Sequence, residues 1–211
     1  MITDDFINLL ARDARVRPVR AVQLWLPVAI ALALSAVLMA VTVGIRDDLL
    51  LLTHSPLFWF KLAFLGSITI VGWRAVLAVS TPGATGEYLR LALTLALLAL
   101  AVVAVVMVLQ ADAVVRPQLL WGTTWKWCSI IIAAMSMPMY LATLRLMRRR
   151  APTHLRLAGA DAGFSSGAAA ALIYCLHCPE LAPSFVGVWY IIGICIPTAA
   201  GALMGRNMLA W

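Results

Sequence analysis

The chain has 211 residues, of which 64% are hydrophobic and only 12% are charged, and its mean hydropathy is +0.97. This apolar surface exceeds what a soluble fold of the same length buries in one core, so the composition excludes an ordinary soluble protein and predicts an all-α membrane protein. The formal net charge of +7 is no indication of nucleic-acid binding, because basic residues also gather beside the anionic inner leaflet of a membrane.

Residues 1–21 predict a cytoplasmic tail that contains a short amphipathic helix. Thr3 is a candidate N-cap, and the helix should end before Pro18. One face has the i, i+3, i+4, i+7 spacing of a helix that binds in a partner's groove, and it consists of Phe6, Leu9, Leu10 and Asp13. A helix lying on the inner leaflet, helped by the arginines of the tail, fits the same pattern. The residues alone leave both alternatives open.

Residues 22–211 contain six apolar segments that are each long enough to cross a membrane. About 20 residues are needed to cross roughly 30 Å of hydrocarbon, and the segments cover 22–44, 57–79, 88–110, 123–146, 156–177 and 185–207. The first segment is not a cleavable signal peptide, because it is longer than a signal core and lacks a small-residue cleavage site after it. The predicted fold is therefore a polytopic bundle of six transmembrane helices.

The basic residues between the segments predict the orientation of the bundle. With a cytoplasmic N-terminus, the inner side receives all but five of the 16 lysines and arginines; the exceptions are Arg46 and Arg116 in outer loops and Lys61, Arg74 and Lys126 within spans. Such a bias in short loops predicts that both termini are cytoplasmic.

The charged residues within the segments could mark a transport path or reach the headgroups. Lys61 and Lys126 lie near outer boundaries, while Arg74 and Asp161 lie toward inner boundaries. We expect these side chains to reach the membrane surface by snorkelling. The two halves of the chain also show no clear inverted repeat with interrupted helices, which argues against a secondary transporter.

The last two segments carry rows of small residues. The fifth contains Gly159, Gly163 and Gly167, and the sixth ends with Gly201 and Gly205. Small residues at this spacing let helix backbones approach closely. We expect these two helices to pack tightly, either within one chain or across a homodimer.

Most of the cysteines are predicted to lie near the outer surface. The motif YCLHCPE holds Cys175, His177, Cys178 and Glu180, and Cys128 lies at a comparable depth in the fourth segment. Simple burial, a disulfide in an oxidising compartment, and ligation of a soft ion such as Cu(I), Zn(II) or Cd(II) all fit these thiols. Glu180 is a candidate ligand or hydrogen-bond acceptor for the third alternative. Cys195, about mid-membrane, is expected to be a small buried hydrophobe.

Five stretches carry a resemblance to a known family: WKWC (125–128), LRLMRRRAPTHLRLAGADAGFSSGAAAA (144–171), YCLHCPE (174–180), FVGVWYIIGI (185–194) and GALMGRNMLAW (201–211). Together they resemble the NrsF family of bacterial membrane anti-sigma factors. The resemblance implies a six-span inner-membrane protein that holds an extracytoplasmic-function sigma factor inactive and releases it under heavy-metal stress. It also implies that the functional cysteines are Cys128 and Cys178. Cys175 departs from the family pattern, which leaves open whether the site has two thiols or three.

The resulting hypothesis is a transmembrane switch and not an enzyme, with no obligatory cofactor. Cys128 and Cys178, with Cys175 and His177 as further candidates, would sense a thiophilic metal (Cu, Zn or Cd) or an oxidant. The tail would bind the sigma factor, without direct contact to nucleic acid. Two alternatives remain: a membrane thiol–disulfide oxidoreductase that passes electrons to a quinone, and a metal transporter, although the spans offer few polar ligands in mid-membrane.

Overall fold

The computed structural model describes residues 21–44, 49–81 and 86–210. The predicted tail helix and its face of Phe6, Leu9, Leu10 and Asp13 therefore lie outside the described residues. Every regular element within the described ranges is a helix, which confirms the all-α class there. The elements are α2 (Ala21–Thr42), α3 (Leu49–Leu52), α4 (Pro56–Val79), α5 (Glu87–Gln110), α6 (Arg116–Trp121), α7 (Trp125–Arg148), α8 (Leu155–Tyr174), α9 (Pro183–Phe185), the π-helix η1 (Val186–Tyr190) and α10 (Ile191–Leu209).

Proline and glycine set several of these boundaries. Pro56 and Pro183 open α4 and α9, where the fixed φ of proline suits the first turn and its missing N–H costs no hydrogen bond. Gly44 follows α2 with φ +85° and Gly86 precedes α5 with φ +64°, which is the left-handed region that glycine adopts most easily.

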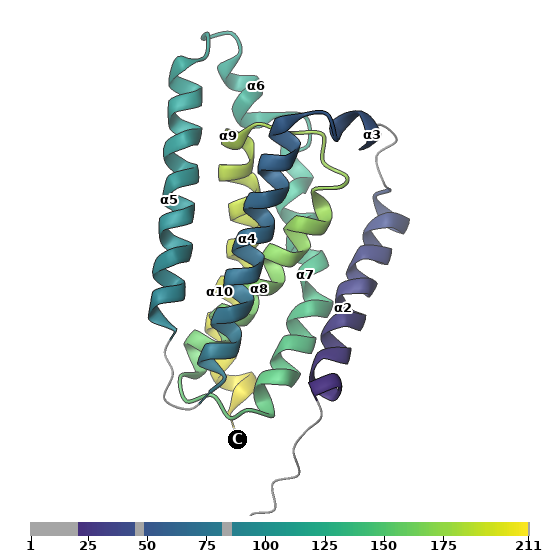
Figure 1. The fold of residues 1–211 in the computed structure, drawn as a ribbon, viewed down its shortest axis with the longest axis vertical. Helices are drawn as coiled ribbons and strands as arrows, with labels where there is room; N and C mark the ends of the chain where they lie inside the picture. The colour runs from purple at the N-terminus through teal and green to yellow at the C-terminus, as the bar shows by residue number, and fades with distance from the viewer. Residues whose placement is uncertain (1–20, 45–48, 82–85, 211) are drawn as a thin grey trace, which may run out of the picture.

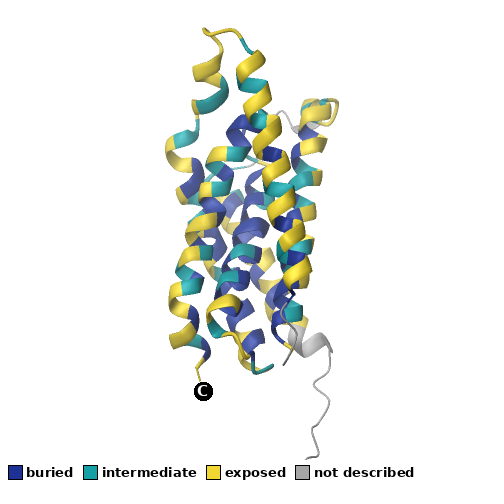
Figure 2. Ribbon diagram, turned by 90° about the vertical axis from the view of Figure 1, so that its left-hand side faces the viewer, coloured by how far each residue is buried: buried dark blue, intermediate teal, exposed yellow. Residues whose placement is uncertain are grey.

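Five stretches of the described chain are helical, long and apolar enough to cross a membrane: Trp25–Thr42, Pro56–Val79, Glu87–Gln110, Arg116–Arg148 and Pro183–Leu209. The remaining long helix, α8, is rich in glycine, alanine and serine, and 13 of its 20 residues are buried. Figure 2 shows the buried residues on the faces that the helices turn toward one another and the exposed residues on the outside. α8 has little need of apolar side chains for lipid, because other helices surround it. A sixth crossing by α8 stays a prediction.

α8 packs against α10, α4, α7 and α2, and its closest contact is with α10 (Figure 1). A Cβ atom added to Gly163 would overlap the carbonyl oxygen of Pro197, and one added to Gly201 would overlap that of Gly159. The glycine rows therefore bring two helices of the same chain into backbone contact, so the tight packing needs no second copy.

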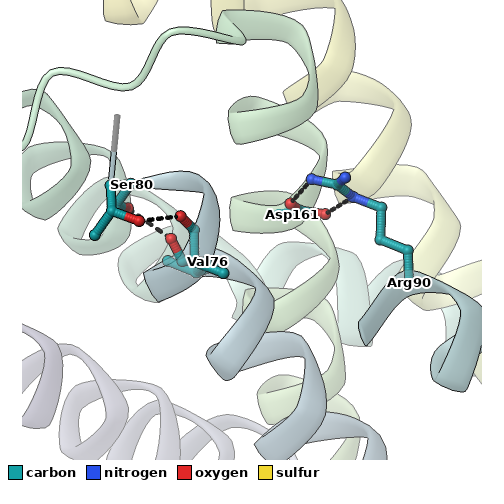
Figure 3. Close-up of polar contacts among 6 residues, drawn as sticks. Val76, Ser80, Arg90 and Asp161 are labelled. Carbon is teal, nitrogen blue, oxygen red and sulfur yellow. Dashed lines mark hydrogen bonds and ion pairs between the residues drawn. The ribbon is translucent and has the colours of Figure 1, made fainter. Parts of the chain in front are cut away.

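A partly buried ion pair joins α5 to α8 near the end of the bundle where the C-terminus lies. Arg90 donates from Nη2 to Oδ2 of Asp161 over 2.6 Å and from Nε to Oδ1 over 3.2 Å (Figure 3). Asp161 is buried. The prediction that Asp161 reaches the headgroups is therefore wrong, because its carboxylate turns toward the protein and forms a bidentate ion pair with Arg90.

Candidate functional site

Three of the four cysteines gather at one end of the bundle. Cys128 lies in the first turn of α7, and Cys175 and Cys178 directly follow the end of α8. We call this the cysteine end; it is the upper end in Figure 1, opposite the labelled C-terminus. All three thiols are free and buried, whereas Cys195 is exposed on α10. The expectation that Cys195 is buried is wrong, because that face of α10 points away from the other helices.

Cys128 and Cys178 lie within hydrogen-bonding reach of each other. Backbone hydrogen bonds position both residues. The Cys128 N–H donates to the carbonyl of Thr124, just before α7. The Cys178 N–H donates to the carbonyl of Tyr174, the last residue of α8. The hydroxyl oxygen of Thr124 also lies 3.6 Å from Sγ of Cys178. The thiol pair thus links the beginning of α7 to the turn that follows α8.

Lys61 of α4 is a member of this site that the sequence analysis missed. Its side chain is only 1% exposed, its Nζ donates to the backbone carbonyl of Glu180 over 2.8 Å, and the same atom lies 4.4 Å from the ring centroid of Tyr190. The prediction that Lys61 snorkels to the surface is therefore wrong. The sequence does place a lysine within a predicted span at the depth of the cysteines. It could not show that the Glu180 carbonyl lies inside the protein as its hydrogen-bond acceptor.

The surroundings of Cys178 favour its thiolate form. Its pKa is lowered from the ordinary thiol value, chiefly because the Cys128 side chain hydrogen-bonds to its sulfur, and the Lys61 ammonium adds an attractive charge. Burial opposes this effect, because a charged sulfur loses hydration inside the protein. A thiolate is the reactive form in both oxidation and metal ligation.

Glu180 and His177 have other partners than the thiols. The carboxylate of Glu180 accepts hydrogen bonds from the backbone N–H and the hydroxyl of Thr123, over 2.7 and 2.9 Å. Nδ1 of His177 lies 2.9 Å from the carbonyl oxygen of Gly44. In the part of the chain that the structure describes, no group of three or more His, Cys, Asp or Glu side chains is placed to hold a metal ion. The roles predicted for these two residues, and for Cys175, stay predictions.

These features define a class: a helical protein with segments long and apolar enough to cross a membrane and a buried thiol pair at one end. The sequence profile of the family described as NrsF, Negative regulator of sigma F, matches residues 10–211. The chain is 40% identical over 213 residues to the "Probable anti-sigma-F factor NrsF" of Azospira oryzae, with 100% of both chains covered. It is 32% identical over 214 residues to the "Anti-sigma-F factor NrsF" of Caulobacter vibrioides, again with 100% of both covered. No solved structure matches the chain.

The chain therefore belongs to the NrsF family, the negative regulators of sigma F, and the resemblance noted in its sequence is confirmed.

Proposed function

We propose that this protein is a bacterial inner-membrane anti-sigma factor that binds an extracytoplasmic-function sigma factor through its N-terminal tail. The observation that supports this most is the identity, over the full length of both chains, to relatives named as anti-sigma-F factors. In this proposal α8 is the sixth crossing, both termini are cytoplasmic and the cysteine end faces the periplasm. The protein acts by binding and release, without catalysing a reaction.

The release step is assigned to the pair Cys128 and Cys178. A two-electron oxidant would join the two sulfurs in a disulfide, taking up two electrons as the thiols lose two protons. A thiophilic ion such as Cu(I), Zn(II) or Cd(II) would instead bind the two thiolates, with further ligands from the same end of the protein. Either reaction joins α7 to the turn after α8 more firmly than the two neighbouring thiols do. The reaction favours release of the sigma factor only if the reacted site is more stable in the helix arrangement that has released the sigma factor than in the arrangement that binds it.

A cysteine series tests the sensor. Cys128→Ser and Cys178→Ser should each abolish the response of a sigma-dependent reporter to Cu, Cd or an oxidant, and the double variant should be no worse than either, because residues that act as one unit are not additive. Repression in unstressed cells should persist in all three variants.

Cys195→Ser is the matched control, because that thiol lies on the exposed face of α10. It should respond like the parent. Cys175→Ser should weaken the response only if the third thiol takes part. A full response in Cys178→Ser, at parental protein levels, would show that sensing lies elsewhere in the chain.

The partner is tested by co-purifying the solubilised full-length protein with the sigma factor. Leu10→Asp puts a charge on the predicted binding face, which should cost several kcal/mol if that face is desolvated in the complex, and should leave sigma-dependent transcription permanently on. Asn8→Asp adds the same charge on the opposite face and should bind normally. Full binding of the sigma factor by Leu10→Asp would show that this face of the tail is not the binding element.

A further inference from the structure

α2 is the helix that leads from the N-terminal tail into the bundle, and it lies at the bundle's edge (Figure 1). Its main contacts are with α7 and α8. The Ser35 hydroxyl donates to the carbonyl of Met135 over 3.0 Å, and buried Val28, Ala31 and Met39 face the bundle, whereas many of its other side chains are exposed. α2 thus rests on the two helices whose ends the thiol pair connects.

At the cysteine end, α2 finishes in a tight turn that ends at Gly44. The backbone N–H groups of Val43 and Gly44 both donate to the carbonyl of Met39, over 3.0 and 3.1 Å. Gly44 adopts φ +85°, a conformation that carries no penalty for glycine. Its own carbonyl lies 2.9 Å from Nδ1 of His177. Because a carbonyl can only accept, Nδ1 must carry the proton and donate.

His177 and Cys178 belong to one hydrogen-bonded turn. Their backbone N–H groups both donate to the carbonyl of Tyr174, over 3.0 and 3.1 Å. Two residues further on, Glu180 is anchored from two sides, by Lys61 at its carbonyl and by Thr123 at its carboxylate. We therefore expect the bonds to Glu180 to resist a displacement of Cys178 on that side, so that His177 takes up the movement.

We propose that His177 is a coupling residue, which passes a reaction at Cys178 to α2 through the hydrogen bond from its Nδ1 to the Gly44 carbonyl. The inference deepens the proposed function and rests on it for its effect on transcription. It gives His177 a positioning role in place of that of a metal ligand. α2 directly follows in the sequence the tail to which the proposed function assigns sigma-factor binding.

Three variants separate this role from a merely structural one. His177→Phe keeps an aromatic ring beside Tyr174, whose ring centroid lies 5.7 Å from that of His177, but has no donor. His177→Asn retains a side-chain N–H close to the position of Nδ1. His54→Phe is the control, because His54 is an exposed histidine in the connection between α3 and α4 at the same end.

The full-length protein in lipid nanodiscs is treated with diamide, which takes up two electrons and two protons as the disulfide forms. Hydrogen–deuterium exchange is then followed in peptides from Ala21–Thr42, and the disulfide is measured in each sample by mass spectrometry. Oxidation should change exchange in α2 of the parent, His54→Phe and His177→Asn. In His177→Phe the disulfide should form normally, but the change in α2 should be at least about fivefold smaller, as expected from losing one hydrogen bond of ordinary strength.

An equal change in α2 of His177→Phe would overturn the proposal, as would the absence of a change in the parent. Loss of disulfide formation in His177→Phe would place His177 in the thiol site itself, and a His177→Asn variant that behaves like His177→Phe would exclude the hydrogen bond as the link. A reporter assay in cells keeps the two proposals apart. If α2 responds in the parent but sigma-dependent transcription does not, the coupling stands and the proposed function fails.

Discussion

At the scale of single residues, the arrangement around Lys61 explains how a lysine is accommodated in the interior. An ammonium group removed from water is costly unless its hydrogen bonds and charge are compensated. Lys61 meets a backbone carbonyl and the face of the Tyr190 ring, and its positive charge acts on the buried sulfurs. The same three interactions tie α4 to the cysteine end, so this residue contributes both to the local fold and to the reactivity of the thiols.

Replacing Lys61 should make Cys178 less reactive at pH values near and below its pKa of about 5. In Lys61→Met the attractive charge is lost, so the pKa of Cys178 rises and less thiolate is present at a given pH. Alkylation by a small reagent should slow by up to about tenfold, as for a pKa change of one, and the two proteins should converge once the pH exceeds both pKa values. The measurement is a pH–rate profile of Cys178 modification by mass spectrometry.

Lys126→Met provides the comparison, because Lys126 lies at the same end but is exposed beside Trp125. It should keep the parental profile. An unchanged profile in Lys61→Met would mean that its ammonium does not act on the sulfur.

At the scale of elements, α8 is the helix on which the bundle is assembled. It has small residues where α10 crosses it, a carboxylate where Arg90 approaches from α5, and the thiol turn at its end. Small side chains permit close backbone approach, but they also leave no room for adjustment. We therefore expect a change in the position of α8 to affect α10, α4 and α7 together.

This packing predicts different effects for two glycines in helices. Gly163→Ala should destabilise the protein by about 1–3 kcal/mol, the usual cost of overpacking, because the new Cβ overlaps the Pro197 carbonyl of α10. Gly66→Ala in α4 should be neutral or should stabilise by about 0.5–1 kcal/mol, because no atom lies within 4 Å of the new Cβ. Thermal unfolding in detergent measures both. Equal melting temperatures for the two variants would contradict the close approach of α8 and α10.

At the scale of the whole molecule, the two ends of the bundle differ in chemistry. The cysteine end holds the buried thiols and Lys61, while the opposite end carries exposed arginines on α7, α8 and α10: Arg145, Arg148, Arg156 and Arg206. Basic residues in short loops are retained on the cytoplasmic side of a bacterial membrane. In the proposed orientation, a signal that enters at the thiols crosses the membrane before it reaches the tail.

The orientation can be checked with reporter fusions. A phosphatase that is active only in the periplasm should be inactive when fused after Trp211 and active when inserted after Asp112, in the connection between α5 and α6. A cytoplasmic fluorescent reporter should show the opposite pattern. An active phosphatase at the C-terminus would reverse the orientation and place the thiols on the cytoplasmic side.

The sequence by itself determined the features that depend on local composition. The predicted spans 57–79 and 88–110 begin one residue inside α4 (Pro56–Val79) and α5 (Glu87–Gln110). The agreement is close because apolar runs, prolines and glycines determine helix boundaries through local effects on the backbone. The family was likewise available from motifs, and the resemblance implied that Cys128 and Cys178 are the functional cysteines, which stays a prediction. The sequence showed the small residues of α8 but did not reveal that this helix lies inside the bundle, since that position is a property of the whole assembly.

The tertiary structure alone decided which partner each buried polar group has. Lys61 bonds to a carbonyl 119 residues away, Asp161 to an arginine 71 residues away, and His177 to a glycine 133 residues away. Hydropathy places such groups at a depth in the membrane but does not show which helices lie beside them. A buried charge or imidazole takes the nearest donor or acceptor that the packing provides, because leaving it unpaired is costly. For that reason Lys61 and Asp161 turn inward, and His177 bonds to the end of α2.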